Sequence, residues 1–178
     1  MPAPIPVELK EHDKAWAENA WRESKRLIAA TGDRIITVHH IGSTAIQNVR
    51  AKPILDLMPA VSSLAEFDGC RAVLEKLGYE WWGEYGLPGR RYCTLHDPLT
   101  GARKVQLHCY EQGSPEITRH LAFRDYLRSN PDLAREYDAE KTRCRDRHPQ
   151  DSHAYSDCKS ACIRRIEARA LSASLPKT

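Results

Sequence analysis

The sequence predicts an α+β fold in which a mixed β-sheet is flanked by helices and followed by a helical C-terminal layer. Alternating and β-branched segments lie between residues 35 and 111, helical patterns surround them, and the last third of the chain carries helical patterns alone. The 178 residues, of which 41% are hydrophobic, suffice for one compact core. No internal repeat or flexible linker interrupts them, so residues 1–178 are expected to form a single domain.

The first part of the chain predicts one helix and two strands. Residues 8–30 carry apolar side chains at helical spacing, and residues 35–42 form a β-branched strand that runs into a small polar turn. Residues 52–61 form a second apolar strand with one acidic residue, Asp56. The apolar stripe of the helix consists of Leu9, Trp16, Ala20 and Leu27.

The middle of the chain predicts another helix and three strands. Ser63 and Glu66 form a capping box that begins a helix, and Gly78 ends it. Asp97–Gly101 is a hairpin turn between the last two of the strands. These strands are expected at residues 79–82, 90–96 and 103–111.

Three helices are expected in the C-terminal third. Ser114 and Asn130 are each followed by proline, which favours the first position of a helix because its missing N–H is not needed there. Asp151 or Ser152 can cap the last helix.

Charge and composition exclude several classes of function. The chain has 27 basic and 24 acidic residues, a formal net charge of +3 and a pI near 8.5, which is far from the concentrated basicity of a dedicated nucleic-acid-binding protein. No segment has the length and apolarity of a signal peptide or a membrane span. We therefore expect a cytoplasmic protein, a monomer or homodimer, that acts on a small molecule without nucleic-acid or membrane partners.

The six cysteines are expected to be reduced, because the chain is long enough to fold without disulfides. One alternative stays open. Cys144, His148, Cys158 and Cys162 have C-x3-H and C-x3-C spacing, so each pair shares a helix face and the four side chains are candidate zinc ligands. The competing interpretation is that these cysteines are ordinary buried thiols.

The most informative stretch is the turn Gly42-Ser43-Thr44 together with Asp56. A glycine-serine turn after a strand allows backbone amides and a hydroxyl to approach phosphate, although most such turns only connect elements. A carboxylate in an apolar strand needs a metal ion, a cation or several hydrogen bonds, because burying it without a partner is costly. Together they predict a triphosphate site with Mg²⁺ at Asp56.

Histidines lie on two of the predicted strands. Strand alternation places His40 on one face with Gly42, and His108 on one face with Gln106. If these faces agree with that of Asp56, then His40, Asp56 and His108 converge on one cleft and would also suit a transition metal. The alternative is that each histidine is a polar residue at the end of a strand.

Basic residues of the later segments have two interpretations. Most such side chains are solvated, but they become phosphate ligands if they face the Gly42-Ser43 turn. Those on the C-terminal helices are Arg124, Arg128, Lys141 and Lys159, and those on the strand pair are Arg90, Arg91 and Arg103.

The stretch HIGSTAIQNVRAKPILDL, from His40 to Leu57, resembles the GrpB family pattern, which runs roughly E-H-I-G-S-T-S-V-P-G-L-x-A-K-P-I-I-D-I. Further matches follow in the same order over nearly the whole chain. They are Gly78-Tyr79, Leu107-His108, the FRDYLR stretch at 123–128, Tyr137 with Lys141, and Tyr155 with Lys159.

This resemblance implies a nucleotidyltransferase fold that binds ATP or another nucleoside triphosphate. It implies that Gly42, Ser43 and Thr44 hold phosphate, that Asp56 holds Mg²⁺, and that basic residues supply counter-charge. His108 stands where such folds carry a further metal carboxylate, so Asp56 and His108 are the candidate metal ligands. The candidate basic residues are Lys52, Arg124, Lys141 and Lys159.

The chain departs from the family pattern at chemically important positions. His39 stands in place of a glutamate and Gln106 in place of a histidine, while Met58 occupies the second carboxylate position of the D-x-D motif of active nucleotidyltransferases. A two-metal mechanism needs more oxygen ligands than Asp56 alone supplies.

Three functions remain open from the sequence. The first is an enzyme that transfers a nucleotidyl group to a small acceptor or activates the acceptor, with His40 or His108 as base. The second is a module that binds a nucleotide or anion without turnover, which Met58 favours. The third is a transition-metal hydrolase built on His40, Asp56 and His108.

Overall fold

The computed structural model describes residues 4–174, which divide into two compact units. The unit that contains the β-strands, called the sheet unit, combines Lys14–Gly42 with Ile54–Thr118. The prediction of a single domain stays a prediction. The other unit, called the helical unit, consists of the N-terminal segment up to Asp13, the segment Ser43–Pro53 and the chain from Arg119 onward.

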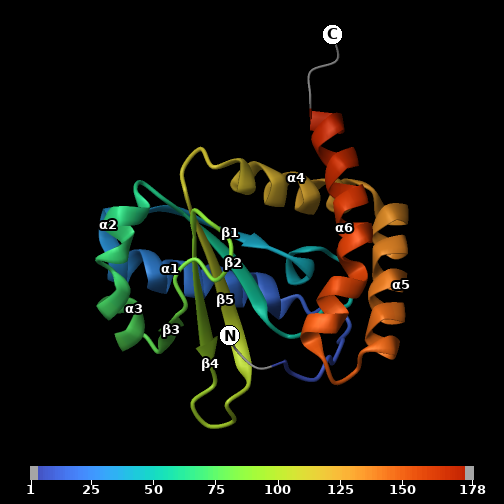
Figure 1. Cartoon of the computed structure of the whole chain (residues 1–178), viewed down its shortest axis with the longest axis horizontal. Helices are drawn as coiled ribbons and strands as arrows, with labels where there is room; N and C mark the ends of the chain where they lie inside the picture. The colour runs from blue at the N-terminus through green and yellow to red at the C-terminus, as the bar shows by residue number, and fades with distance from the viewer. Residues whose placement is uncertain (1–3, 175–178) are drawn as a thin grey trace. The chain divides into compact units, whose positions relative to one another are not determined.

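The sheet unit contains one five-stranded mixed sheet in the order β1-β2-β5-β4-β3 (Figure 1). Strands β2 and β5 are parallel, and every other neighbouring pair is antiparallel. The α+β class and the five predicted strands are therefore confirmed. The strands are β1 (Ile35–Ile41), β2 (Leu55–Val61), β3 (Tyr79–Trp81), β4 (Arg90–His96) and β5 (Arg103–Glu111).

The first helix, α1 (Ala15–Thr31), is shorter than the expected helix over residues 8–30. The backbone of Lys10 instead forms a bridge with Ala51, and the Val7 amide donates to the Pro149 carbonyl at 2.8 Å. These long-range hydrogen bonds hold the N-terminal segment extended. The predicted stripe is confirmed from Trp16 onward, because Trp16, Ala20 and Leu27 are buried.

The helix expected after Ser63 is two short helices, α2 (Leu64–Asp68) and α3 (Arg71–Lys76). The predicted cap is present, since Ser63 Oγ accepts from the Glu66 amide at 3.4 Å. The amides of Gly69 and Cys70 bond to carbonyls three residues back, which tightens the chain and separates the two helices.

Strand pairing assigns each side chain to one of two faces, because residues directly opposite each other share a face. On the apolar face, the Tyr79 hydroxyl donates to Glu23 of α1 at 2.6 Å, so α1 covers this side. The apolar face carries Leu57, Cys93, Leu95, Leu107 and Cys109. The opposite face, called the polar face, carries His39, Asp56, Met58, Arg90, Tyr92, Thr94, Gln106 and His108.

The helical unit is built mainly from α5 (Pro131–Arg147) and α6 (Ser152–Ser174), which lie side by side (Figure 1). Helix α4 (Pro115–Ser129) begins in the sheet unit and enters the helical unit at Arg119. Both predicted proline starts are confirmed, and Asp151 Oδ1 caps α6 by accepting from two backbone amides. The core contains Ile46, Val49, Phe123, Leu127, Leu133, Ala134, Tyr137, Cys162 and Ile166.

The segment Ser43–Pro53 joins the helical unit through packing and charge. It begins with a 3-10 turn, Ser43–Ala45, and then buries Ile46 completely. Arg50 is held by Asp138 of α5, whose carboxylate accepts from the Arg50 amide at 2.8 Å and from its Nε and Nη2 at 2.9 and 2.7 Å. A charge-assisted fork of this kind fixes the segment on the helix.

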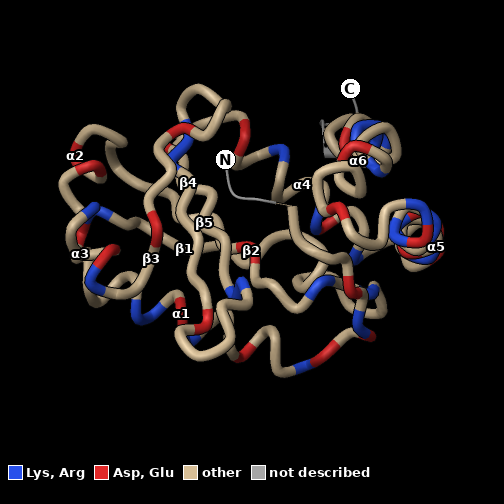
Figure 2. Tube along the Cα trace, turned by 60° about the horizontal axis from the view of Figure 1, so that its bottom comes forward, with Lys and Arg blue, Asp and Glu red and all other residues tan. Residues whose placement is uncertain are grey.

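Basic and acidic residues alternate along both units, and Figure 2 shows no long tract of one sign. Among the described residues, no helix combines the length and the apolarity needed to cross a bilayer.

Candidate functional site

The Asp56 carboxylate lies between Gly42 and His108 in the sheet unit. Gly42 directly follows β1 and has a φ of 69°, and a Cβ atom built on it would lie 2.5 Å from Asp56 Oδ2. The other carboxylate oxygen, Oδ1, is 3.2 Å from His108 Nε2. The sequence therefore identified three residues that the fold brings together at the adjoining ends of β1 and β2 and on β5.

Tyr92 and Gln106 extend this group along the polar face. The Tyr92 hydroxyl donates to Gln106 Oε1 at 2.7 Å, and its ring centroid lies 5.3 Å from that of His108. Burial raises the pKa of Tyr92, and the negative charge of Asp56 acts in the same direction. The hydroxyl is therefore a neutral donor near pH 7. Sequence reasoning missed Tyr92, because its strand carries no motif.

His40 does not join this group, so the predicted convergence of His40, Asp56 and His108 is wrong. The register pairs Ile41 with Asp56 and His40 with Leu57, which puts His40 on the face opposite Asp56. A site for a transition metal built on those three side chains is therefore not formed.

Three of the positions at which the chain departs from the family pattern, namely His39, Met58 and Gln106, lie on the polar face together with Asp56. His39 is opposite Met58 in the β1–β2 pairing, and Gln106 is opposite Asp56 in the β2–β5 pairing. Met58 is fully buried, so an apolar thioether occupies the position of a second carboxylate. These three substitutions therefore lie on the face of the sheet where Asp56 lies, whereas a fourth departure, the loop at residues 46–49, belongs to the helical unit.

Asp56 suits a magnesium ion that is held mainly by phosphates and water. Within residues 4–174, no three side chains of His, Cys, Asp or Glu gather closely enough to hold a metal ion by themselves. Mg²⁺ does not require such a cage, because it usually keeps several waters and binds one or two protein carboxylates together with substrate phosphates. The protein side chains at this site therefore suit one magnesium ion at Asp56 and not a pair of magnesium ions.

In the helical unit, the same Tyr-x3-Lys spacing occurs on both long helices. Lys141 Nζ lies 5.3 Å from the ring centroid of Tyr137 on α5, and Lys159 Nζ lies 4.9 Å from that of Tyr155 on α6. Lys141 is 1% exposed and donates to the Arg50 carbonyl. The sequence offered both pairs as matches to the family pattern, and a spacing of four residues places the members of each pair on one helix face.

Two residues of the segment Ser43–Pro53 contact the same tyrosines. Ser43 Oγ lies 3.4 Å from the Tyr137 hydroxyl, and Lys52 Nζ lies 5.8 Å from the ring centroid of Tyr155. Thr44 is buried. These contacts form two sets, and the electrostatic influence of Tyr137 on Tyr155 links them into one group of four predicted residues and two tyrosines, called the lysine cluster. It consists of Ser43, Lys52, Tyr137, Lys141, Tyr155 and Lys159.

Arg124 and Arg128 make different contacts. Arg124 forms a fork with the neighbouring Asp125, at 2.8 and 3.1 Å, and its role as a phosphate ligand stays a prediction. Arg128 instead reaches the turn, donating from Nε to the Ala45 carbonyl at 2.8 Å. Burial and the nearby Arg124 charge both lower the pKa of Arg128. Arg128 is therefore the arginine that supports the Ser43–Ala45 turn.

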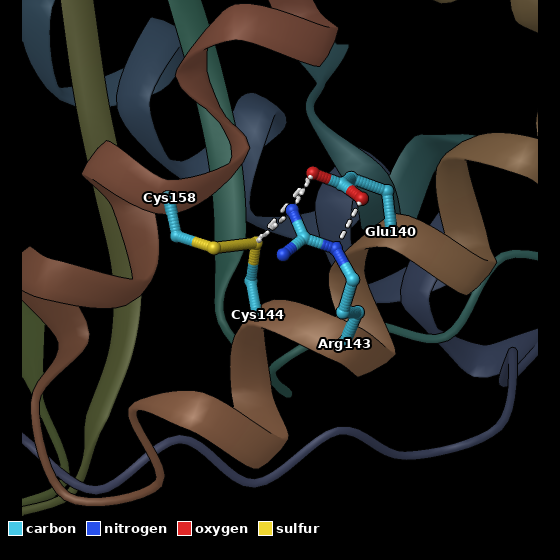
Figure 3. Close-up of a disulfide and its surroundings, with 4 residues drawn as sticks. All are labelled: Glu140, Arg143, Cys144 and Cys158. Carbon is cyan, nitrogen blue, oxygen red and sulfur yellow. Dashed lines mark hydrogen bonds and ion pairs between the residues drawn. A yellow bond between two sulfur atoms is a disulfide. The ribbon is translucent and has the colours of Figure 1, made fainter.

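Cys144 and Cys158 form a disulfide, so the expectation that all six cysteines are reduced is wrong (Figure 3). Their Cα atoms are 5.7 Å apart because α5 and α6 pack together there. With these sulfurs bonded to each other, the zinc site expected at Cys144, His148, Cys158 and Cys162 is not formed. The free cysteines of the described chain are Cys70, Cys93, Cys109 and Cys162, all buried.

Known proteins resemble the chain over most of its length. The UPF0157 protein YqkA of Bacillus subtilis is 39% identical over 164 residues, which are 92% of this chain but 47% of YqkA. The crystal structure of the conserved protein GrpB from Enterococcus faecalis superposes with a TM-score of 0.86 at 37% identity, covering 93% of this chain and 98% of that one.

A more distant comparison identifies the fold. Cid1 in complex with its short product ApU matches with a TM-score of 0.53 at 12% identity, over 74% of this chain and 41% of Cid1. Likeness at that identity concerns the fold alone, and the fold is that of the nucleotidyltransferases. The model of the family described as "GrpB protein" matches residues 6–169. The chain therefore belongs to the GrpB family.

Proposed function

We propose that the protein binds a nucleoside triphosphate such as ATP together with Mg²⁺, and transfers a nucleotidyl group to a small acceptor or activates that acceptor. The nucleotidyltransferase fold supports the class of reaction, and the lysine cluster is the observation that carries the proposal. Three ammonium groups from separate segments surround two tyrosine rings. A polyphosphate carries several negative charges, so positively charged groups from separate segments would each attract it.

The lysine cluster has the chemistry that phosphate recognition requires. Lys52 and Lys159 share the Tyr155 ring, and Ser43 adds a hydroxyl beside Tyr137. Ammonium groups act as point charges toward phosphate oxygens, and hydroxyls add directed hydrogen bonds. Burial raises the pKa of Tyr155, so its ring and hydroxyl stay neutral beside the two lysines.

In this proposal Asp56 binds the magnesium ion, and His108 orients the Asp56 carboxylate. When bound, Mg²⁺ would neutralise phosphate charge during transfer. The 3.2 Å contact with His108 fixes one carboxylate oxygen, and the close approach of Gly42 limits movement of the other. His108 is also the one remaining candidate base, because His40 lies on the other face.

Nucleotide binding can be measured by isothermal titration calorimetry with the four common nucleoside triphosphates, with and without Mg²⁺. Lys159→Gln is expected to weaken binding by about tenfold or more, since a hydrogen bond to a charged group contributes about 1.5 to 3 kcal/mol. Lys25→Gln is the matched control, because Lys25 Nζ also lies over an aromatic ring, that of Trp21 at 5.8 Å, outside the cluster. Asp56→Asn should remove the dependence on Mg²⁺.

Absence of binding by every nucleotide would refute the proposal. If Lys159→Gln and Lys25→Gln weaken nucleotide binding equally, the lysine cluster is not the nucleotide-binding site.

A second function, nucleotide binding without turnover, is favoured by one observation. Met58 is buried where the D-x-D motif has its second carboxylate, which leaves Asp56 as the only carboxylate of β2. Release of pyrophosphate in the presence of candidate acceptors separates the two functions. Sustained release supports transfer, whereas tight binding with no release supports a binding module.

A further inference from the structure

Arg90, the first residue of β4, is a buried cation for which the described chain provides no anionic partner. Its residue surface is 7% exposed. Nε and Nη2 donate to the carbonyls of Glu84 and Tyr85 at 3.3 and 2.8 Å. Its guanidinium carbon lies 5.0 Å from the ring centroid of Tyr92 and 5.8 Å from that of Tyr85. No carboxylate of the described residues lies within 4.0 Å of it.

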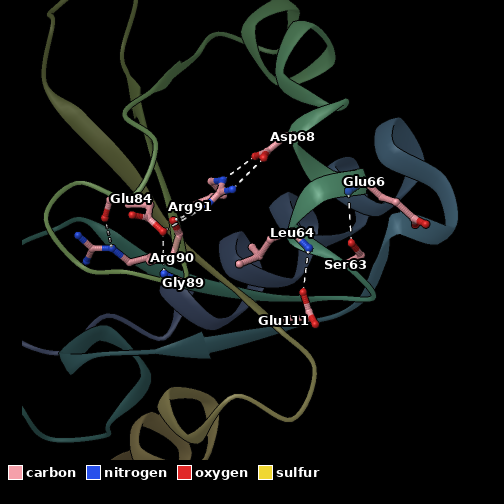
Figure 4. Close-up of polar contacts among 9 residues, drawn as sticks. All are labelled: Ser63, Leu64, Glu66, Asp68, Glu84, Gly89, Arg90, Arg91 and Glu111. Carbon is pink, nitrogen blue, oxygen red and sulfur yellow. Dashed lines mark hydrogen bonds and ion pairs between the residues drawn. The ribbon is translucent and has the colours of Figure 1, made fainter.

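The carboxylates of Glu84 and Asp68 are committed to other groups. Glu84 accepts from the Gly89 amide at 2.9 Å, and the same oxygen lies 3.8 Å from Arg91 (Figure 4). Arg91 itself donates from Nη2 to Asp68 at 2.8 Å. Two adjacent arginines on opposite faces of β4 therefore differ: Arg91 is neutralised, and Arg90 is not.

The aromatic rings offset only part of the cost of burying this charge. Cation–π contacts are weak compared with the cost of removing an unpaired ion from water. The described residues provide no hydrogen-bond partner for Nη1. A guanidinium edge that includes Nη1 thus remains for a ligand, and its planar geometry suits two oxygens of one carboxylate or phosphate.

Arg90 belongs to the same polar face as Asp56. Its guanidinium stacks on Tyr92, the Tyr92 ring lies 5.3 Å from that of His108, and His108 contacts Asp56 at 3.2 Å. Trp82, which precedes the loop that Arg90 holds, donates to Thr94 of this face at 2.9 Å. A ligand on Arg90 would therefore extend along the polar face toward Asp56.

We propose that Arg90 binds an oxyanion group, a carboxylate or a phosphate, of the acceptor molecule. Anion binding by Arg90 stands on the contacts above. Its assignment to the acceptor rests on the proposed function, because only a transfer reaction has an acceptor.

Arginine side-chain resonances of isotope-labelled protein can test this with acetate and inorganic phosphate as probes, without any nucleotide. Both probes are titrated at constant ionic strength, and the Arg90 Nε signal is assigned from its loss in Arg90→Lys. A saturable shift of the Arg90 signal is expected, together with no saturable shift of the Arg91 signal. Tighter binding of acetate would indicate a carboxylate on the acceptor, and tighter binding of phosphate would indicate a phosphate.

Two variants separate recognition from loop anchoring. Arg90→Lys keeps the positive charge but loses the fork, and should weaken binding of the better probe by about tenfold, as followed by the backbone amide resonances of β4. Arg91→Lys is the matched control and should leave the affinity within about twofold. If the wild-type Arg90 signal shows no saturable shift with either probe, Arg90 only anchors the loop and the proposal is overturned. That result would leave the lysine cluster and nucleotide binding untouched.

Discussion

Gly42 and Asp56 are packed so closely that a Cβ atom on Gly42 would lie 2.5 Å from Asp56 Oδ2. Gly42 also has a φ of 69°, in the left-handed region that side chains with a Cβ disfavour. Two separate requirements therefore select glycine here, one from the backbone and one from the carboxylate.

Gly42→Ala should lower the free energy of unfolding and displace Asp56. The left-handed backbone costs about 1 to 2 kcal/mol, and the steric overlap costs a further ~1 to 3 kcal/mol. Gly101→Ala is the matched control, because Gly101 has a φ of 70° and nothing lies within 4 Å of the position that a Cβ atom would occupy there. Urea unfolding of both variants isolates the contact with Asp56. Equal losses of unfolding free energy in the two variants would show that the contact with Asp56 adds no cost.

Asp138→Asn should release the segment Ser43–Pro53 from α5. The Asp138 carboxylate accepts three hydrogen bonds from Arg50, and its side chain is 16% exposed. We expect a loss of about 2 kcal/mol in unfolding free energy, because the neutral amide cannot replace the charged fork. Asp132→Asn removes an ion pair whose carboxylate is 88% exposed, and should change stability little. Chemical denaturation measures both.

Removing the disulfide should destabilise the helical unit. Cys144 and Cys158 are separated by 14 residues, and closing a loop of that size is associated with about 3 kcal/mol. The double variant Cys144→Ala, Cys158→Ala should therefore unfold at lower urea concentration than the oxidised protein. A reductant should destabilise the wild type but not the double variant. If it affects neither, the two thiols are not paired in solution.

The buried thiol of Cys93 predicts a loss of stability at alkaline pH. Burial raises the pKa of Cys93 to about 12, whereas a thiol in the unfolded chain has a pKa of about 8.5. Between these values the unfolded chain binds fewer protons than the native protein. The stabilisation is complete below about pH 8.5, and it falls by about 1.4 kcal/mol per pH unit up to about pH 12.

Cys93→Ala should reduce that slope, as measured by urea unfolding at a series of pH values. Val105→Ala serves as the control, because it removes buried apolar volume and no ionisable group. It should lower stability by a similar amount at every pH. An unchanged slope in Cys93→Ala would show that the thiol does not titrate in this window.

Local signals were sufficient to predict much of the fold. Alternation identified the strands, and proline after Ser114 and Asn130 marked the starts of α4 and α5. The grouping of Gly42, Asp56 and His108 also followed from sequence, because a turn, a strand carboxylate and a later strand are close in a mixed sheet. The assignment of Mg²⁺ and ATP to these residues stays a prediction.

Other features depend on contacts between distant segments, which local patterns do not encode. Alternation defines the two faces of one strand but not the register between strands, and the β1–β2 register placed His40 opposite Leu57. The N-terminal segment has a helical pattern, yet its amides pair with Ala51 and Pro149.

The sequence by itself determined the α+β class, the family, the Gly42-Ser43 turn and the Tyr-x3-Lys spacing on two helices. Tertiary structure alone decided that Lys52 joins Lys159 on one tyrosine ring, that Cys144 meets Cys158, and that Arg90 is buried without a carboxylate. The physical reason is that spacing along one helix or strand fixes which residues share a face. Packing between elements then fixes which faces meet and which charges are removed from water.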